Sequence, residues 1–299
     1  MSTGVLILTG ATASGKTALG ITLARAFDAE IVGMDSRQIY CGMPIGTAAP
    51  TLEERAGVPH HLIGFLDPGE RYSAARFVVD ALAAIDAIHA RGKRALIVGG
   101  TGFYMRALCG DTTLTADRDD GLRARLAREV RLHPTEILAD WLRALEPRRV
   151  DVPLDPYRLT RALEIALVAR SGEPPAPGEP LPTLRSRGIA YRKLQLALEP
   201  AALAANIEAR VDSMLAAGLI AEAEQVGEDA LAADAVGYRD VFAFQRGEAS
   251  ERELRLLLAR STRRYAKRQA TWFRTEPDLS VVRNATEALA LARTFPAWM

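Results

Sequence analysis

Cysteine and histidine are scarce in this chain of 299 residues. The two cysteines, Cys41 and Cys109, lie far apart with no CxxC pair, and the four histidines have no spacing that would complete a metal site with them. The opening MSTGVLILTG has no basic start, and its apolar run is far shorter than a signal-peptide core or a membrane span. We therefore expect a cytoplasmic protein with no disulfide framework, no structural zinc and no membrane partner.

An excess of either charge is also absent from the chain as a whole. Its 38 basic and 37 acidic residues give a net charge of +1, which by itself argues against a polyanionic partner. The segment from Arg252 to Arg274 is the exception, with eight basic residues against Glu253 alone. A solvated helix face would explain this segment, but so many unopposed cations favour contacts with phosphates. Its aromatic residues Tyr265 and Trp272 are interpreted as core anchors.

Apolar segments that alternate with amphipathic helices indicate a layered α/β fold. The composition, 48% apolar and 25% charged, is that of a globular protein with a sizeable core. Because strands and helices alternate, we expect a parallel sheet flanked by helices, and the pattern GxxxxGK[ST] at residues 10–17 makes this sheet P-loop NTPase-like. Buried strands are predicted at residues 4–10, 29–35, 95–100, 192–198 and 279–283, and helices at 16–27, 73–91 and 250–274.

The middle of the chain contains helical patterns and no strand pattern. These patterns fall between about residues 112 and 170. They are followed by SGEPPAPGEPLPT, in which five prolines in thirteen residues exclude regular structure. We interpret residues 112–185 as an inserted all-helical domain. The α/β core, with the basic C-terminal helices, would comprise residues 1–111 and 186–299.

The sequence from Gly10 to Thr17 fits the phosphate-binding pattern GxxxxGK[ST], between a predicted strand and a predicted helix. Its glycines let backbone N–H groups turn toward a phosphate, and the helix N-terminus adds its positive end. Lys16 would reach the terminal phosphate, and the Thr17 hydroxyl could hold Mg²⁺. The pattern predicts a diphosphate or triphosphate ligand but does not select ATP. The predicted binding residues are Gly10, Thr12, Ala13, Ser14, Gly15, Lys16 and Thr17.

An acidic residue follows the second predicted strand and not the third. P-loop ATPases usually carry an acid that helps to hold Mg²⁺ after a neighbouring strand, but here the third strand ends in Gly99-Gly100-Thr101-Gly102. Asp35 follows the second strand, at the same sheet edge as the P-loop. A carboxylate there could act on the ligand, or it could cap the turn formed by DSRQ.

Seven segments along the chain together resemble the tRNA dimethylallyltransferases, also called isopentenyl transferases. They follow one another in the family's order: GATASGKT, MDSRQIYCGMPIGTAAP, PHHLIGFLDP, LIVGGTGFYMRAL, DPYRLTRALE, VGYRD and RRYAKRQATWFR. The resemblance implies the bacterial type and Mg²⁺-dependent transfer of a dimethylallyl group from dimethylallyl diphosphate to N6 of the adenosine 3′ to the anticodon, tRNA position 37. It also implies that the P-loop cradles a diphosphate and not ATP.

The same resemblance implies roles for individual residues. Asp35 would take a proton from adenine N6, Thr101 would contact the reaction centre, and Lys16 and Arg210 would be catalytic cations on the diphosphate. Asn206 stands where the family has an arginine, so one cation fewer is expected there. The implied tRNA contacts are Asp35, Ser36, Arg37, Gln38, Thr101, Arg123, Tyr157, Arg158, Leu159, Thr160, Arg161, Gly237, Tyr238, Arg239, Arg263, Lys267 and Arg268.

Three other functions stay open beside this hypothesis. A small-molecule P-loop kinase would carry the acid that the third strand lacks. A prenyltransferase acting on free AMP or ADP would need neither the inserted domain nor the basic helix. An RNA-binding module with a vestigial P-loop would not need an intact Lys16, Thr17 and Asp35. The predicted partners are the tRNA anticodon stem-loop and dimethylallyl diphosphate, and a monomer is expected.

Overall fold

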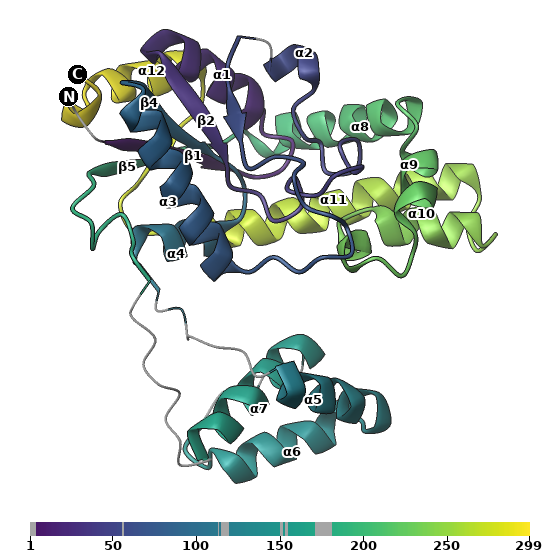
Figure 1. The fold of residues 1–299 in the computed structure, drawn as a ribbon. Coiled ribbons are helices and arrows are strands. Elements are labelled where there is room, and N and C mark those ends of the chain that lie inside the picture. Colours follow the sequence, from purple (N-terminus) through teal and green to yellow (C-terminus); the bar gives the residue numbers. More distant parts are fainter. Residues whose placement is uncertain are drawn as a thin grey trace. The chain divides into compact units, whose positions relative to one another are not determined.

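The structure, a computed structural model, describes residues 4–55, 57–112, 114, 120–149, 152, 155–170 and 181–299. The chain divides into two compact units, drawn in Figure 1. Unit 1 comprises Met1–Thr113 and Pro182–Met299, and unit 2 comprises Leu114–Leu181. These bounds lie within a few residues of the predicted insertion at 112–185.

Unit 1 is built on a six-stranded parallel sheet with the strand order β3-β2-β4-β1-β5-β6 (Figure 1). The short edge strand β3 was not predicted, because two residues leave no periodicity to detect. The other strands fall on the predicted segments. The strands are β1 (Val5–Gly10), β2 (Ala29–Gly33), β3 (His60–His61), β4 (Arg94–Val98), β5 (Tyr191–Leu196) and β6 (Leu279–Val282).

Some helices of unit 1 begin at a side-chain cap. Ser73 Oγ accepts a hydrogen bond from Arg76 N at the start of α3, and Ser250 forms a capping box with Glu253 at the start of α11. The helices are α1 (Lys16–Phe27), α2 (Leu52–Arg55), α3 (Ala74–Ala90), α4 (Gly102–Cys109), α8 (Pro200–Ala216), α9 (Leu219–Val226), α10 (Tyr238–Gln245), α11 (Glu251–Phe273) and α12 (Ala285–Arg293), with 3₁₀ turns η1 (Leu231–Asp234) and η2 (Pro296–Trp298).

Helices cover both faces of the sheet, because successive strand residues point to opposite sides. On one face Leu6, Leu8 and Leu96 pack with Leu23 of α1 and Ala288 of α12. On the other face α3 packs against β2 and β4, and α11 packs against β1. Every residue of β1 is buried, as expected at the centre of a parallel sheet with two covered faces. The predicted α/β fold with a parallel sheet is confirmed.

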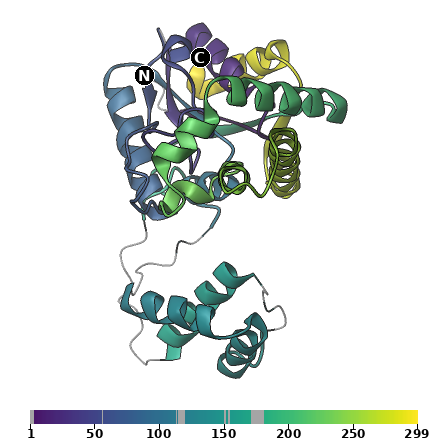
Figure 2. The ribbon, with the colours of Figure 1, turned by 90° about the vertical axis from the view of Figure 1, so that its right-hand side faces the viewer.

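A second apolar core joins the C-terminal helices to the segment that follows β2. Ile39, Tyr40 and Met43 from that segment are buried together with Val211 of α8 and Leu258 of α11. The green to yellow-green helices lie together beside the sheet in both views (Figure 1, Figure 2). This packing brings α8 and α11 toward the loops that follow β1 and β2.

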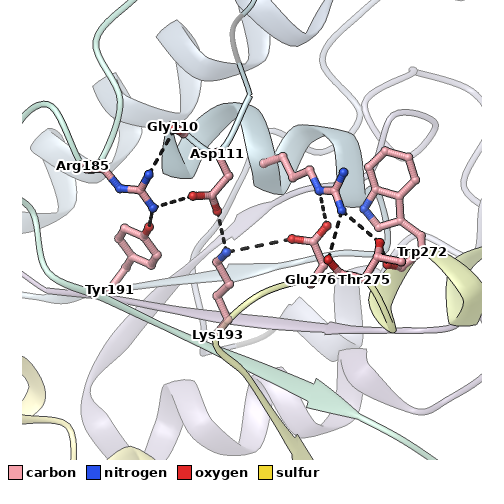
Figure 3. A network of polar contacts seen from close by, with 9 residues as sticks. Gly110, Asp111, Arg185, Tyr191, Lys193, Trp272, Thr275 and Glu276 are labelled. Carbon is pink, nitrogen blue, oxygen red and sulfur yellow. Dashed lines mark hydrogen bonds and ion pairs between the residues drawn. The ribbon is translucent and has the colours of Figure 1, made fainter.

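A network of charged side chains, some of them buried, lies where the chain leaves and re-enters unit 1. Lys193 on β5 is 2% exposed, and its Nζ donates a hydrogen bond to Asp111 Oδ2 at 2.6 Å. Arg185, on the returning chain, also pairs with Asp111 (Figure 3). Arg106 pairs with the buried Glu276. Loss of one partner from such a network would leave an uncompensated buried charge. The network therefore joins the two segments of unit 1 between which the insertion lies.

Unit 2 has a core of its own. Its apolar helix faces meet around Leu126, Leu138, Leu142, Leu159 and Leu163. The predicted helical character of the insertion is confirmed for the described residues, and residues 171–180 of the proline-rich stretch lie outside them. Within the described residues the helices are α5 (Asp120–Leu132), α6 (Thr135–Leu145) and α7 (Pro156–Arg170).

Among the helices that the structure describes, none combines the length and the apolar character that a membrane crossing requires.

Candidate active site

Three loops meet at the C-terminal edge of the sheet, the edge at which parallel α/β sheets bind ligands. The loop after β1 is the P-loop, the loop after β2 carries Asp35, and the loop after β4 carries Thr101. Thr101 N donates a hydrogen bond to Met34 O at 3.3 Å, and Thr101 Oγ1 accepts one from Ser36 N at 3.1 Å. Because β2 and β4 pair in the sheet, the loops that carry Asp35 and Thr101 are neighbours.

The P-loop has the backbone that its glycines predict. Gly15 caps α1 in the left-handed conformation with φ 87°, and Ala13 also has a positive φ of 64°. Ser14 Oγ is buried and has no hydrogen-bond partner within the described part of the chain. Buried hydroxyls usually have a partner, so this oxygen is suited to a bound ligand. The loop and the N-terminus of α1 together have the geometry of a phosphate cradle.

Two side chains from α8 hold the P-loop from outside the sheet. Arg210 Nη1 donates to Thr12 Oγ1 at 3.0 Å, and Asn206 Nδ2 donates to Ala13 O at 3.0 Å. The two residues are four positions apart on α8, so they share one face of the helix. Asn206 therefore supports the backbone of the loop, at a position where the sequence suggested only a missing cation.

Burial changes the acid–base properties of the cations beside the P-loop. Desolvation lowers the pKa of Lys16 to about 8; Arg210 adds to this lowering and Asp35 opposes it. Desolvation also lowers the pKa of Arg210, again against the effect of Asp35. Two partly desolvated cations held close together favour an anion that would neutralise them. The site is therefore electrostatically suited to a diphosphate.

Asp35 caps its own turn with one of its two oxygens. Its Oδ1 accepts hydrogen bonds from Arg37 N at 2.9 Å and from Gln38 N at 3.4 Å. Among the described residues no hydrogen bond involves Oδ2, and Asp35 lines a cavity. The turn-cap interpretation is thus correct for Oδ1, while Oδ2 can interact with a substrate.

The cavity that Asp35 lines has a volume of about 330 Å³ and adjoins the P-loop. Tyr265 of α11 is part of its wall, and burial, together with the nearby charge of Asp35, raises the pKa of the Tyr265 hydroxyl. Tyr265, interpreted from the sequence as a core anchor, is half-buried and lines this cavity. Thr101 accepts a hydrogen bond from the backbone N–H of Ser36, which lines the cavity. The predicted site residues in the wall are Thr12, Gly15, Lys16, Thr17, Asp35, Ser36, Arg37, Gln38, Arg210, Gly237 and Arg268.

Two predicted tRNA contacts are buried, so their side chains cannot touch RNA. Leu159 is 0% exposed in the core of unit 2, and Tyr238 is 0% exposed in the second core of unit 1. Tyr238 OH donates to Glu222 Oε1 at 2.6 Å, and Glu222 also accepts a hydrogen bond from Gly46 N. Both predictions are wrong for the side chains, because these residues stabilise the fold.

The other predicted contacts in unit 1 differ in how far their charges are already paired. Arg37 pairs with Asp234 at 2.9 Å, and Arg263 of α11 pairs with Glu208 of α8. The Gln38 amide donates to backbone carbonyls of its own loop. Of these predicted contacts, the exposed cations with no ion pair among the described residues are Arg239, Lys267 and Arg268.

The predicted contacts in unit 2 lie on α5 and α7. Thr160 Oγ1 donates to Pro156 O, and Arg161 pairs with Glu164 at 2.7 Å. Arg158 is exposed near the start of α7. The side chains of Arg123 and Tyr157 lie outside the described residues.

Comparison with known families decides the assignment. A family described as IPP transferase matches residues 38–276, which is more than half of the chain. This chain belongs to the IPP transferase family. It is therefore an enzyme that transfers prenyl groups, and the family resemblance seen in the sequence is confirmed. A second family description, isopentenyl transferase, matches residues 3–63, which include the P-loop and Asp35.

Curated relatives and solved structures agree with this family. The chain is similar to tRNA dimethylallyltransferase 1 of Trichlorobacter lovleyi (38% identity over 99% of both chains) and to tRNA dimethylallyltransferase of Anaeromyxobacter sp. (41% identity over 97% of this chain and 96% of the relative). A tRNA isopentenylpyrophosphate transferase of Bacillus halodurans matches with TM-score 0.71 and 33% identity over 98% of this chain and 95% of that chain. A eukaryotic dimethylallyltransferase solved acting on tRNA matches with TM-score 0.75 and 26% identity over 98% of this chain and 76% of that chain.

Proposed function

We propose that this chain transfers a dimethylallyl group from dimethylallyl diphosphate to N6 of the adenosine 3′ to the anticodon and releases diphosphate. One observation carries the proposal: the P-loop and Asp35 line the same cavity. A diphosphate bound to the P-loop and the proton acceptor Asp35 would therefore lie at one reaction centre. The curated relatives that match over nearly the whole chain support tRNA as the acceptor. In this proposal the enzyme works in the cytoplasm as a monomer on the anticodon stem-loop.

Asp35 is the general base of the proposed reaction. The lone pair of adenine N6 is delocalised into the ring, so a proton must leave N6 as the new N–C bond forms. The N–C bond forms at the first carbon of the dimethylallyl group while the bond from that carbon to the diphosphate oxygen breaks. The turn holds Asp35 through Oδ1, which leaves Oδ2 to accept the proton. Thr101 steadies the same turn through Ser36 N.

Positive groups around the P-loop stabilise the leaving diphosphate. Negative charge builds on the departing oxygen as the carbon–oxygen bond breaks. Fixed cations and backbone N–H groups lower the energy of that transition state more than that of the bound substrate. Lys16, Arg210 and the N-terminus of α1 supply these groups at the P-loop.

Mg²⁺ fits the donors present beside the P-loop. This ion takes one or two oxygens from a protein and the rest from phosphates and water. Thr17 and Asp35 both line the cavity and offer oxygen ligands, and the described residues contain no cluster of three or more metal-ligating side chains. We propose that Thr17 holds Mg²⁺, which would add positive charge at the leaving diphosphate.

The target base must leave its stack to reach the cavity. An adenine stacked in an anticodon loop cannot enter a recessed pocket, and enzymes that act on bases generally extrude them. Enclosure also keeps water from the allylic carbon, since hydrolysis would compete with transfer. Gly237 and Arg268 line the same cavity, so the elements proposed to bind the anticodon arm border the reaction site.

Ligand and acceptor preferences test the proposed function against its rivals. Because a ligand that binds the native state raises its thermal stability, dimethylallyl diphosphate with Mg²⁺ should raise the melting temperature, whereas ATP should not. Labelled dimethylallyl diphosphate should then label unmodified tRNA and neither AMP nor ADP. Stabilisation by ATP alone would indicate a kinase. Label on AMP or ADP would indicate a nucleotide prenyltransferase.

Neutralising the exposed cations Lys267 and Arg268 on α11 is expected to weaken tRNA binding. The affinity for dimethylallyl diphosphate should fall much less, because the P-loop would hold the diphosphate although Arg268 lines the same cavity. The salt dependence of tRNA binding should fall by up to about one unit of slope for each phosphate that the variant no longer neutralises. Arg263→Gln is the comparison variant and should have a smaller effect, because Glu208 already neutralises Arg263. Binding is measured at several salt concentrations. An unchanged slope in Lys267→Gln/Arg268→Gln would make this surface a solvated face.

A further inference from the structure

We propose that Gln269 is a positioning residue for the transfer reaction, because it ties the P-loop to the loop that carries Thr101. Gln269 lies on α11, is 6% exposed and uses both ends of its side-chain amide. Its Oε1 accepts a hydrogen bond from Thr12 N at 2.7 Å, and its Nε2 donates one to Gly100 O at 2.9 Å. The proposal rests on the proposed function, since it gives Gln269 a part in that reaction.

The bridge formed by Gln269 connects the loop that would bind the diphosphate to the loop that carries Thr101. Thr12 belongs to the loop that cradles the diphosphate, and Gly100 directly precedes Thr101. Thr101 in turn holds the Asp35 turn through Ser36 N. Transfer requires the first carbon of the prenyl group and adenine N6 at near-attack distance, and a misplacement of about 1 Å can cost about 10²-fold in rate. Gln269 therefore sets the spacing between the loops that hold the leaving group and the base.

Close packing leaves the Gln269 amide little freedom to move. A Cβ atom added at Gly100 would lie 2.3 Å from Gln269 Nε2, so glycine at this position makes room for the hydrogen bond. Ala266, three residues earlier on α11, is buried against Ala11 and Ala13 of the P-loop. These small residues let α11 approach the P-loop closely enough for the Gln269 side chain to span both loops.

The substitution Gln269→Ala tests this role, because it removes both hydrogen bonds. We expect its single-turnover rate, at saturating tRNA and dimethylallyl diphosphate, to fall by about 10²-fold while tRNA affinity is retained. Gln245→Ala is the matched control: the Gln245 amide is exposed on α10, donates to Ile220 O at 3.3 Å, and its removal should leave the rate unchanged. A rate loss no larger than the loss of folded protein, or a higher KM for tRNA with unchanged kcat, would overturn the proposal.

A double-mutant cycle with Gly100→Ala tests the bridge itself. Gly100→Ala displaces Nε2 and should also slow transfer, but it should add little to Gln269→Ala, because the hydrogen bond is already absent and space is available. Rate losses that multiply in the double variant would overturn the bridge. No transfer to tRNA by the parent would refute the proposed function. Transfer by the parent with an undiminished rate in Gln269→Ala would refute the role of Gln269 alone.

Discussion

Asp35→Asn is expected to lower the single-turnover rate of dimethylallyl transfer by roughly 10² to 10⁴ fold, the range of general-base catalysis. Asparagine keeps an Oδ1 that can accept the turn hydrogen bonds from Arg37 N and Gln38 N. The change therefore removes the proton acceptor but keeps the cap. The rate is measured at saturating tRNA and dimethylallyl diphosphate, both of which should still bind.

The same experiment separates the possible roles of Asp35. A near-parental rate would mean that the carboxylate only caps the turn. Recovery of the rate at high Mg²⁺ would make Asp35 a metal ligand and not the base. Asp28→Asn is the matched control, because Asp28 is an exposed carboxylate at the opposite end of α1 from the P-loop, paired with Lys93. Its rate should equal that of the parent.

Lys16→Ala is expected to lower kcat/KM for dimethylallyl diphosphate by roughly 10² to 10³ fold, the cost of losing one preorganised group that stabilises developing charge. Lys16 begins α1 within the phosphate cradle, so its ammonium contributes both to binding the diphosphate and to stabilising its departure. KM should rise and kcat should fall, while tRNA affinity is retained. Steady-state kinetics at saturating tRNA measure both constants, and parental values would remove the P-loop from the mechanism.

The pH dependence of ligand binding tests the same lysine independently. Because desolvation lowers the pKa of Lys16 to about 8, the free enzyme loses this ammonium as the pH rises through that value. An anion binds the ammonium form better, so the Kd for dimethylallyl diphosphate should rise above that pH in the parent. Lys16→Ala should lack this additional rise, and ionisation of the ligand affects both proteins equally. Parallel pH profiles for parent and variant would contradict the assignment.

The part of the site that local sequence specifies was predictable. The P-loop is one continuous segment between a strand and a helix, and both elements form where the hydrophobic pattern places them. Asp35 and Thr101 are distant in sequence, but each follows a strand of the same parallel sheet, so their loops must meet at its C-terminal edge. These two rules were enough to bring the P-loop and Asp35 together, whereas the role of Thr101 was implied by the family resemblance.

The side chains that brace the P-loop could not be predicted from local sequence. Asn206 contacts the loop across 193 residues of sequence, and Gln269 contacts it across 257. Neither contact leaves a periodic or spaced pattern, because it depends on how α8 and α11 pack beside the sheet. The position of Tyr265 in the cavity wall also depends on how α11 packs beside the sheet. From the sequence alone, an aromatic residue in a helix is more often buried in a core.

The wrong tRNA contacts arose from treating motif segments as exposed surfaces. Leu159 and Leu163 are four residues apart on α7 and share its buried face, so the apolar spacing carried a signal of burial. Tyr238 carried the same signal, because Val241 and Phe242, three and four residues further along α10, share its buried face. A motif therefore shows which segments matter but not which face of a helix is free to bind.

The position of the transferred group is the most direct test of the proposed reaction. The protein is incubated with labelled dimethylallyl diphosphate, Mg²⁺ and unmodified tRNA, and the labelled nucleoside is then located by digestion and mass spectrometry. We expect one dimethylallyl group per tRNA, on N6 of the adenosine 3′ to the anticodon, with release of one diphosphate. Label on another nucleoside, or diphosphate release with no label on tRNA, would contradict the proposal that the P-loop and Asp35 act together on that adenosine.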